Sequence, residues 1–270
     1  MRFLLLFLKR MFYKNHLPIS DYKIDILVNG PSLKLDLKKH QNNLSNILVV
    51  NQFVKHESFT ILKPKYYLIQ DPYFWDVSII GHWEEKRNST IESLNKNVTW
   101  KMMLILPRKA KKLEKLIINS NITFKYYHEI PLPDKIWSSN KYNFLTKYLL
   151  SKNIISPIPR NVLITAIYIC IISNVKILNI QGADMSFFKE LEVNQETNVV
   201  GILESHFYGT EFFPLFSGKK HKIKSSLSDQ LYKWSCIFKD LEKITHLGLE
   251  LGVDIKNRTS NSYIDFIKRK

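Results

Sequence analysis

The chain has 270 residues, of which 45% are hydrophobic, and this length and composition suit one large globular domain. Its two cysteines, Cys170 and Cys236, each lie in an apolar context, so we expect buried free thiols and neither a disulfide scaffold nor a zinc site. Lysine and arginine outnumber aspartate and glutamate by 40 to 24, for a net charge of +16, so we expect a surface that attracts anionic lipid, acidic glycolipid or nucleic acid.

Residues 1–20 form a separate N-terminal segment with a short apolar run, residues 3–8, between basic residues. The run is far shorter than the ~20 residues that a spanning helix needs. No small-residue cleavage site follows it, which argues against a secretory signal. We expect the segment to contact an anionic membrane surface, with a helix packed on the domain as the alternative. The predicted location is the cytoplasm, at the inner membrane face of a bacterium.

Short apolar runs, each bounded by turn residues, recur along the rest of the chain. They cover residues 24–28, 46–50, 66–69, 101–106, 122–126, 175–180 and 253–256. Runs that are apolar at successive residues are typical of strands buried on both faces, as in a parallel sheet. Helical stretches lie between some of them, at residues 109–119, 162–173 and 227–251. This alternation predicts one doubly wound α/β domain over residues 21–270, with a mainly parallel sheet flanked by helices.

Residues 185–224 interrupt this alternation. The stretch mixes aromatic residues, charges and glycines without a clear period. Long excursions that follow a strand often form lids over active sites. We therefore expect a small irregular lid at about residues 185–224.

A turn follows the first predicted strand, where Asn29, Gly30, Pro31 and Ser32 come in succession. Gly30 lets the backbone approach a ligand closely. Pro31 suits the first turn of a helix, which Asn29 or Ser32 would cap. Free N–H groups at a helix start attract phosphate. The turn predicts a phosphate or nucleotide site, and an ordinary capped turn is the alternative.

Small polar residues also follow three other predicted strands. They are Asn51, Asp71 and, after the turn at Gly182, Asp184. In an open parallel sheet, ligands bind at the carboxyl ends of the strands. We therefore expect these residues to converge with Asn29 in one polar cleft.

The sequence contains no Asp-X-Asp pair, the arrangement with which many sugar-nucleotide transferases hold a divalent metal on a diphosphate. Its absence predicts metal-independent chemistry and no cofactor. His206 lies inside the excursion, and a histidine that titrates near neutrality can remove a proton from an attacking hydroxyl. A loop histidine without a catalytic role is the alternative.

Several of these segments occur in the same order as in a known family. They are residues 29–33 (Asn-Gly-Pro-Ser-Leu), 51–53 (Asn-Gln-Phe), 182–184 (Gly-Ala-Asp) and 205–206 (Ser-His). Together they resemble the bacterial lipooligosaccharide sialyltransferases, glycosyltransferase family 42. Residues 254–264 are similar to the closing motif of that family, so the resemblance covers roughly residues 22–266.

The resemblance implies a modified Rossmann domain with a lid, CMP-sialic acid as the donor, no metal and transfer with inversion. It further implies that Asn29, Gly30 and Ser32 contact the CMP moiety and that Asn51 contacts the sialyl donor.

Three further residues receive roles from the same resemblance. Asp71 stands where the family has an asparagine near the donor sugar. Asp184, after Gly182, is expected at the cytidine side of the donor. His206 is expected to be the general base that deprotonates the acceptor hydroxyl.

The match is imperfect around Arg160, which resembles a family arginine that precedes a Thr-Ser-Gly turn. Either Asn161 or Thr165 stands in for the serine of that turn, depending on where a gap falls.

The chain departs from the family at the leaving phosphate. The family places a tyrosine two residues after the aspartate of its Gly-Ile-Asp motif, assisted by a second tyrosine in the lid. This chain has Ser186 at the first position and no tyrosine between Asp184 and His206. Ser186 and Tyr208 are the residues expected to take over this contact, and the donor sugar stays open at this point.

The sequence therefore predicts a metal-independent inverting glycosyltransferase that transfers sialic acid from CMP to a lipooligosaccharide or capsule-type glycan. The alternatives are a related transferase with another nucleotide sugar, and a basic protein that binds nucleic acid or membrane without catalysis. Expected partners are the CMP-sugar donor, a glycan or glycolipid acceptor and an anionic membrane surface. A homo-oligomer is left open, and nucleic acid is not the expected partner because no zinc ligands or RNA-binding motifs are found.

Overall fold

The computed structural model describes residues 19–40, 43–134, 137, 144–206, 209–217 and 223–269. For residues 204–206, 209–211, 217 and 223 it describes the backbone alone. Most of the N-terminal segment, residues 1–18, lies outside the described residues, so its predicted membrane contact stays a prediction. Among the described residues, no helix is long and apolar enough to cross a membrane.

The main sheet has seven strands in the order β12-β6-β1-β2-β3-β4-β5, and every pairing in it is parallel. The strands are β1 (Lys23–Leu27), β2 (Ile47–Val50), β3 (Tyr66–Leu68), β4 (Met102–Pro107), β5 (Ile122–Tyr127), β6 (Ile177–Gln181) and β12 (Asp254–Asn257). Each apolar run in the sequence forms one of these strands. The predicted doubly wound α/β, Rossmann-like fold is therefore confirmed.

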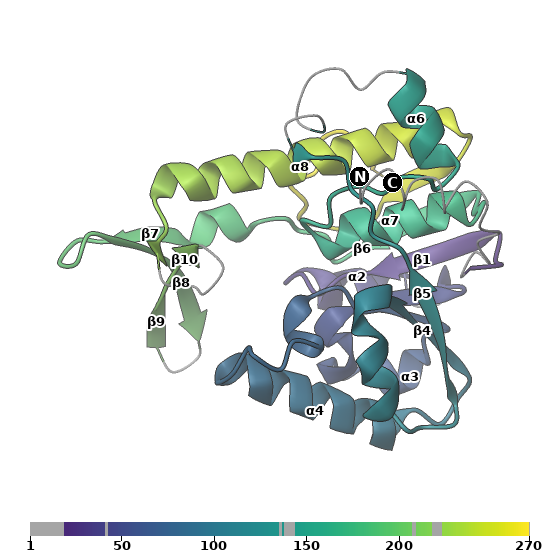
Figure 1. Cartoon of the computed structure of the whole chain (residues 1–270), viewed down its shortest axis with the longest axis horizontal. Helices are drawn as coiled ribbons and strands as arrows, with labels where there is room; N and C mark the ends of the chain where they lie inside the picture. Colours follow the sequence, from purple (N-terminus) through teal and green to yellow (C-terminus); the bar gives the residue numbers. More distant parts are fainter. Residues whose placement is uncertain are drawn as a thin grey trace, which may run out of the picture.

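Helices cover both faces of this sheet (Figure 1). On one face, α7 (Val162–Ile172) and α8 (Leu227–Glu250) pack with the strands into one hydrophobic core. On the other face, α2 (Leu33–His40) and α4 (His82–Asn97) contribute to a second core. The strands are buried from both sides, which explains why they read as continuous apolar runs.

The two long helices on the first face differ in sequence because they differ in burial. Almost every residue of α7 is buried, since the helix lies between the sheet and α8. The Asn161 side chain caps α7 by accepting a hydrogen bond from the Leu163 N–H. A capping box of Ser226 and Asp229 starts α8, which keeps one side in solvent.

The shorter helical elements lie in the connections between strands. They are α3 (Phe59–Leu62), α6 (Phe144–Ser151), and the 3₁₀ segments η2 (Asn51–Lys55), η3 (Pro72–Phe74), η4 (Arg108–Lys115) and η5 (Phe187–Glu190). The predicted helix over residues 109–119 is the 3₁₀ segment η4. Its buried residues Ala110 and Leu113 are three apart, which fits the three residues per turn of a 3₁₀ helix.

Residues 185–224 are more regular than the sequence predicted. Strands β7 (Leu191–Asn194), β8 (Val199–His206) and β9 (Gly209–Pro214) form an antiparallel sheet, and β10 (Phe216–Ser217) pairs with β11 (Ile223–Lys224). The small sheet stands to one side of the main sheet (Figure 1). Short antiparallel strands with one solvated face lack the continuous apolar runs that marked the parallel strands. Its role as a lid stays a prediction.

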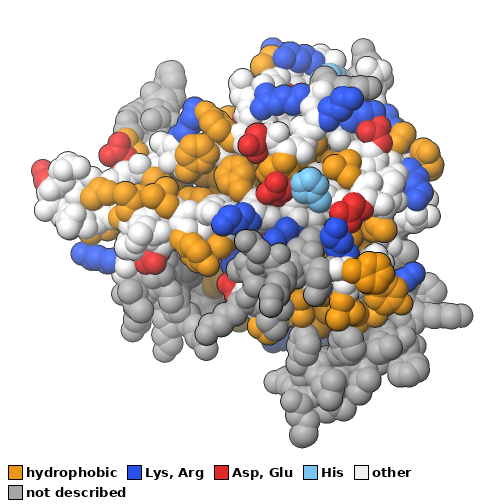
Figure 2. All heavy atoms as spheres, turned by 90° about the horizontal axis from the view of Figure 1, so that it is seen from above, with side chains coloured by type: hydrophobic (Ala, Val, Ile, Leu, Met, Phe, Trp, Pro, Cys, Tyr) orange, Lys and Arg blue, Asp and Glu red, His pale blue; other side chains and the backbone are white. Residues whose placement is uncertain are grey.

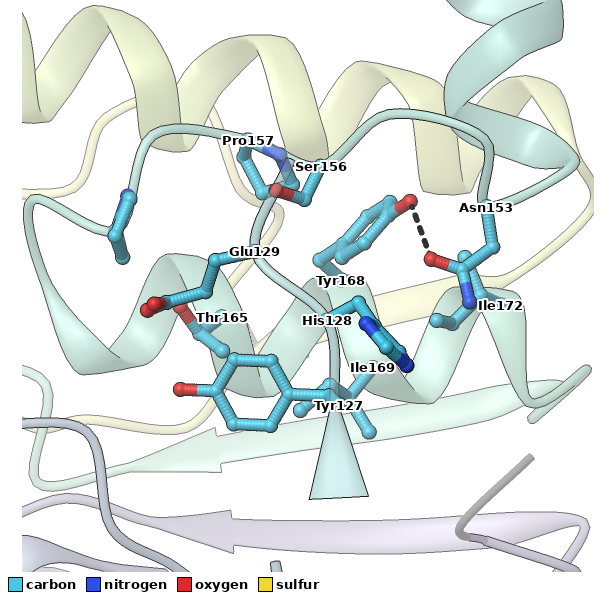
Figure 3. Close-up of a pocket in the computed structure, with 11 residues that line it drawn as sticks. Tyr127, His128, Glu129, Asn153, Ser156, Pro157, Thr165, Tyr168, Ile169 and Ile172 are labelled. Carbon is cyan, nitrogen blue, oxygen red and sulfur yellow. Dashed lines mark hydrogen bonds between the residues drawn. The ribbon is translucent and has the colours of Figure 1, made fainter. Parts of the chain in front are cut away.

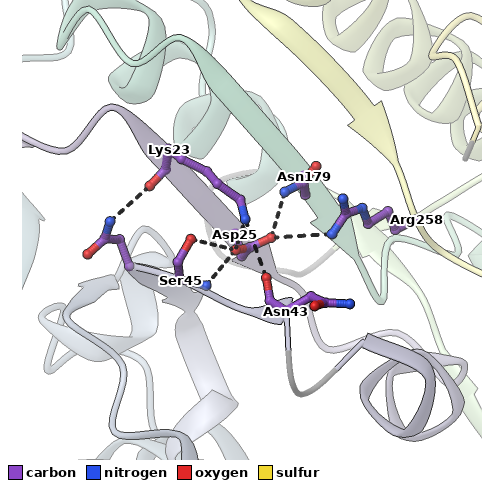
Figure 4. A network of polar contacts seen from close by, with 7 residues as sticks. Lys23, Asp25, Asn43, Ser45, Asn179 and Arg258 are labelled. Carbon is purple, nitrogen blue, oxygen red and sulfur yellow. Dashed lines mark hydrogen bonds and ion pairs between the residues drawn. The ribbon is translucent and has the colours of Figure 1, made fainter.

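A buried polar network joins the middle of the main sheet on the α2 side (Figure 4). The Asp25 carboxylate accepts hydrogen bonds from the Ser45 N–H at 2.7 Å and from the Asn179 amide at 2.8 Å. Arg258 and Lys23 approach it to 4.0 and 3.9 Å. The network links β1, β6 and the segments that follow α2 and β12, so it helps to set their register.

The order in which the strands join the sheet reverses between β1 and β6, so a topological switch point lies between these two strands. From β1 the chain builds β2 to β5 on one side, and then returns to place β6 and β12 on the other side. Such a switch point opens a crevice at the carboxyl ends of the two strands. The turns that follow β1 and β6 therefore lie at the place where this fold class binds ligands.

Candidate functional site

The turns after β1 and β6 are joined by the side chain of Asp184, 152 residues away from Ser32 along the chain. The Asp184 carboxylate accepts hydrogen bonds from the Ser32 hydroxyl at 2.9 Å and from the Ser32 N–H at 3.2 Å. The Gly30 N–H donates to the Gly182 carbonyl at 2.8 Å. The structure thus brings Gly30, Ser32, Gly182 and Asp184 together, as the order of the motifs predicted.

Glycine is required at both turns for steric reasons. A Cβ atom on Gly30 would lie 2.1 Å from Asp184 Oδ2 and 2.3 Å from the Gly182 carbonyl oxygen. Gly182 has a φ of +67°, and a Cβ there would lie 2.3 Å from the Val28 carbonyl oxygen. Gly30 therefore makes room for the carboxylate of Asp184, whereas the sequence suggested room for a ligand.

The N–H groups of Gly30 and Ser32 are not free at this turn. They bond to Gly182 and Asp184, and the Leu33 N–H bonds to the Gly30 carbonyl at 3.0 Å. Pro31 has no N–H to offer. The Ser32 N–H, just before α2, therefore holds a protein carboxylate, and a phosphate contact at the start of α2 stays a prediction.

Burial raises the pKa of Asp184, and the hydrogen bonds from Ser32 act in the opposite direction. Nearby Asp36, which is fully buried, adds to the rise. Asp36 is held by the Ser32 hydroxyl at 3.3 Å, the Gly182 N–H at 2.9 Å and the Ser260 N–H at 2.8 Å. Through these hydrogen bonds, Asp36 and Asp184 connect the turns after β1 and β6 to the segment after β12.

A second group of predicted residues meets at the ends of β1, β2 and β3. The exposed Asn29 donates its amide to the Val50 carbonyl at 3.1 Å. Asn51 donates its amide to Asp71 Oδ2 at 2.8 Å and accepts a hydrogen bond from the Gln70 N–H at 3.0 Å. Asn51 has a φ of 46°, a left-handed conformation that asparagine tolerates better than most residues. The ends of β1, β2 and β3 therefore meet in one polar region, and the predicted cleft that also includes Asp184 stays a prediction.

Burial raises the pKa of Asp71 to about 6, and the hydrogen bond from Asn51 lowers it only in part. No lysine or arginine pairs with Asp71 within the described part of the chain. A carboxylate in such a position binds a proton near neutral pH and is a functional candidate on physical grounds.

Sequence reasoning missed three residues beside this group, namely Gln70, Tyr127 and Glu129. Three of their atoms are buried and have no hydrogen-bond partner in the part of the chain that the structure describes: Gln70 Oε1, the Tyr127 hydroxyl oxygen and Glu129 Oε1. Tyr127 and Glu129 line a narrow cavity of about 10 Å³ against α7, and their polar ends point to the same side (Figure 3). Tyr127 ends β5 and Glu129 follows it, and neither is a small polar residue of the kind that marked the other strand ends.

Arg160 and its neighbours lie in and just before α7, with separate contacts. Arg160 donates to Asp240 at 2.8 Å and pairs with Asp134 at 2.5 Å. Asn161 uses its side-chain oxygen to cap α7, and Thr165 is buried beside the cavity of Tyr127 and Glu129. The catalytic role of Arg160 and the donor contacts of Asn161 and Thr165 stay predictions.

The remaining predicted residues lie on or next to the small sheet. Ser186 precedes η5 and is partly exposed. His206 ends β8, where its backbone pairs with Gly209, and its side chain lies outside the described part of the structure. Tyr208 lies outside the described residues altogether. Among the described residues, no group of three or more His, Cys, Asp or Glu side chains is arranged to hold a metal ion.

Comparisons with known proteins find little that is similar. No family model matches the chain, and no curated protein matches it in sequence. Among solved structures, the MAf glycosyltransferase from Magnetospirillum magneticum AMB-1 is similar over 95% of this chain, with 11% sequence identity and a TM-score of 0.49. The match covers 34% of that protein, so the chain spans about a third of its length. The glycosyltransferase activity in that name is a property of the Magnetospirillum protein.

Proposed function

We propose that the chain is a glycosyltransferase that binds a nucleotide-activated sugar at the carboxyl ends of β1, β2, β3 and β6. The observation that carries this proposal is the convergence of two polar pairs, Ser32 with Asp184 and Asn51 with Asp71, beside the switch point of a parallel sheet. This is where open α/β sheets bind their ligands. The order of the sequence motifs supports the same reading.

The proposed roles follow the geometry of the strand ends. Asn29 and Asp184, beside the turns at Gly30 and Gly182, contact the nucleoside. Asn51 and Asp71 contact the donor sugar. Neighbouring strands are about 4.8 Å apart, so the ends of β1 and β3 are separated by about 10 Å, a distance that a nucleotide sugar spans. Ser186 or Tyr208 stabilises the leaving phosphate.

The donor has two candidates. CMP-sialic acid, transferred with inversion and without a metal, is the donor that the resemblance to family 42 implies. Another nucleotide sugar is the alternative, and the aspartate at position 71 in place of asparagine favours it.

A thermal-shift screen with CMP, UDP, GDP and their sugars tests the proposal. A ligand at 100 times its Kd adds about 2.7 kcal/mol to the stability of the folded state, so we expect the Tm to rise by several degrees. Inorganic pyrophosphate at the same ionic strength is the control for simple attraction to a chain of charge +16. If pyrophosphate gives the same shift as every nucleotide, no nucleotide site exists.

His206 is the proposed general base that removes the proton from the acceptor hydroxyl. General-base catalysis contributes about 10²- to 10⁴-fold in rate. His206→Ala should lower turnover by that factor and leave the nucleotide-induced thermal shift unchanged. His246→Ala, on the exposed side of α8, is the matched control. Wild-type turnover of the His206 variant would remove this residue from the role.

The proposed acceptor is a glycan or glycolipid at the inner membrane face, supported by the excess of positive charge. The rival is a basic protein that binds nucleic acid or membrane without catalysis. Salt-dependent DNA binding together with no hydrolysis of any nucleotide sugar would favour the rival.

A further inference from the structure

Asp71 has neither a positive neighbour nor several hydrogen-bond donors among the described residues. Asp25 lies near Arg258, and Asp240 pairs with Arg160. Asp36 and Asp184 have no cationic neighbour there either, but Asp36 accepts hydrogen bonds from three groups and Asp184 from two. Asp71 receives only the Asn51 amide in that part of the chain. A buried charge without a counter-charge is costly, and proteins rarely keep one without a use for it. The folded chain therefore keeps a negative charge at the end of β3 that lowers the stability of the folded state.

Unpaired polar atoms surround the same place. Gln70 is 5% exposed, and its Oε1 has no hydrogen-bond partner among the described residues. The same holds for the buried Tyr127 hydroxyl and Glu129 Oε1. Each such atom costs about 1–3 kcal/mol when it stays unpaired. Three of the ten such atoms in the described part of the chain lie in this region, which makes it a candidate site for a hydrogen-bonding ligand.

These atoms belong to one region. The Gln70 amide donates to the Pro159 carbonyl at 3.1 Å, and Pro159 lines the same cavity as Tyr127 and Glu129. Burial, then Glu129, then Asp71 raise the pKa of Tyr127, so both carboxylates act on its hydroxyl. The cavity of about 10 Å³ has room for one group the size of a hydroxyl.

The chemistry of the region favours a ligand that donates hydrogen bonds. The free atoms of Gln70, Glu129 and Asp71 are acceptors, and the Tyr127 hydroxyl can donate or accept. Lys109 already pairs with Glu129 Oε2 at 2.5 Å, which leaves the Asp71 charge uncompensated. Sugar hydroxyls suit these acceptors, whereas a second carboxylate would be repelled by Asp71.

We propose, on the basis of the glycosyltransferase function above, that Asp71, Gln70, Tyr127 and Glu129 form the donor-sugar subsite, and that this subsite takes a sugar with hydroxyl groups and no carboxylate. One sugar hydroxyl enters the narrow cavity and bonds to Tyr127, and others bond to Asp71. The subsite therefore rejects sialic acid and uronic acids in favour of a neutral sugar.

Pairs of probes with and without a sugar carboxylate test the charge selection, and only the UDP pair differs in the carboxylate alone. The full chain is titrated with UDP-glucose and UDP-glucuronic acid, and with CMP and CMP-sialic acid. The wild type should bind the probe without the sugar carboxylate about tenfold or more tightly in the pair whose nucleotide it accepts. Asp71→Asn, which retains an acceptor for Asn51, should reduce that ratio about tenfold. Asp254→Asn, the same charge change on an exposed residue at the start of β12, should leave the ratio unchanged.

Tyr127→Phe tests the hydrogen-bonding part of the subsite. The hydroxyl has no hydrogen-bond partner among the described residues, so its removal should leave the Tm unchanged or slightly raised. Affinity for the neutral sugar nucleotide should nevertheless fall about three- to tenfold, while affinity for the free nucleotide stays the same. A purely structural tyrosine would not separate these two affinities.

The outcomes distinguish this inference from the proposed function. If the wild type binds CMP-sialic acid or UDP-glucuronic acid as tightly as the partner probe, nucleotide binding stands and the charge selection is overturned. Unchanged selectivity in Asp71→Asn, or unchanged sugar affinity in Tyr127→Phe, also overturns it. If no nucleotide and no nucleotide sugar binds, both the inference and the glycosyltransferase function fail.

Discussion

The carboxylate of Asp71 is partly buried, and its only hydrogen bond among the described residues comes from Asn51. Burial lifts its pKa to about 6 from an ordinary value of 3.8. The folded chain therefore binds this proton more tightly than the unfolded chain. At pH 7 the ionised carboxylate lowers the stability of the folded state, and this loss disappears as the pH falls through 6 toward 4.

Asp71→Asn should remove that loss. We expect it to stabilise the folded state by about 1–3 kcal/mol at pH 8, and by little at pH 4, because the wild-type side chain is then protonated in the fold. Urea unfolding at the two pH values measures the difference. A stabilisation that is the same at pH 4 and pH 8 would show that ionisation is not its cause.

Single residues also show which features of the site could be predicted from the sequence and which could not. The turn at Gly30 was recognisable as a candidate site, but the sequence gives no sign that Asp184 occupies the space that this glycine leaves. Gln70 and Tyr127 were passed over because a buried glutamine or tyrosine at a strand end is usually paired inside the protein. Only the structure shows that the Gln70 Oε1 and the Tyr127 hydroxyl have no hydrogen-bond partner among the described residues.

At the scale of elements, the strands of the main sheet are held in register by polar contacts as well as by apolar packing. Asp25 on β1 receives hydrogen bonds from Ser45 and from Asn179 on β6, and Arg258 lies close by (Figure 4). A buried carboxylate with several donors leaves them all unpaired when it is removed.

Asp25→Ala should therefore destabilise the fold by about 2–4 kcal/mol, measured by urea unfolding at neutral pH. Lys23→Met is the matched control. Its ammonium lies 3.9 Å from Asp25 and is one-third exposed, so its loss should cost less than about 1 kcal/mol. Equal effects of the two substitutions would contradict the view that the hydrogen bonds of Asp25, and not its ion pairs, carry the stability.

The small sheet is the element that the sequence predicted least well. Its position and its separate composition were visible between residues 185 and 224, but its strand pairing was not. Antiparallel pairing such as that of β8 with β9 depends on which residues meet across the turn. A stretch of mixed composition leaves that register open.

At the scale of the whole molecule, the net charge of +16 is distributed and not confined to one site. On the face that carries α8, Figure 2 shows lysine and arginine side chains scattered among clusters of hydrophobic ones. Exposed Leu231 and Tyr232 on α8 belong to the hydrophobic surface. A surface of this kind attracts anionic membranes through many weak contacts, which salt screens.

The chain should therefore sediment with vesicles that contain anionic lipid and not with vesicles of neutral lipid. Binding should fall steeply between about 0.1 and 0.5 M salt, because the Debye length shortens from about 10 Å to less than half of that. Binding that is equal for neutral and anionic vesicles would contradict an electrostatic origin.

The sequence by itself determined the strands of the main sheet and two of its helices. Apolar residues in succession mark strands that are buried on both faces, and this pattern needs only neighbours along the chain, so the strands of the main sheet, the buried helix α7 and the long helix α8 were all predictable. The tertiary structure alone decided which strand ends lie together. It placed Asp184 against Ser32, 152 residues away, and gathered Asp71, Gln70 and Tyr127 at one edge. Such proximity depends on the order in which strands join the sheet, which is set by packing over the whole chain and leaves no local mark in the sequence.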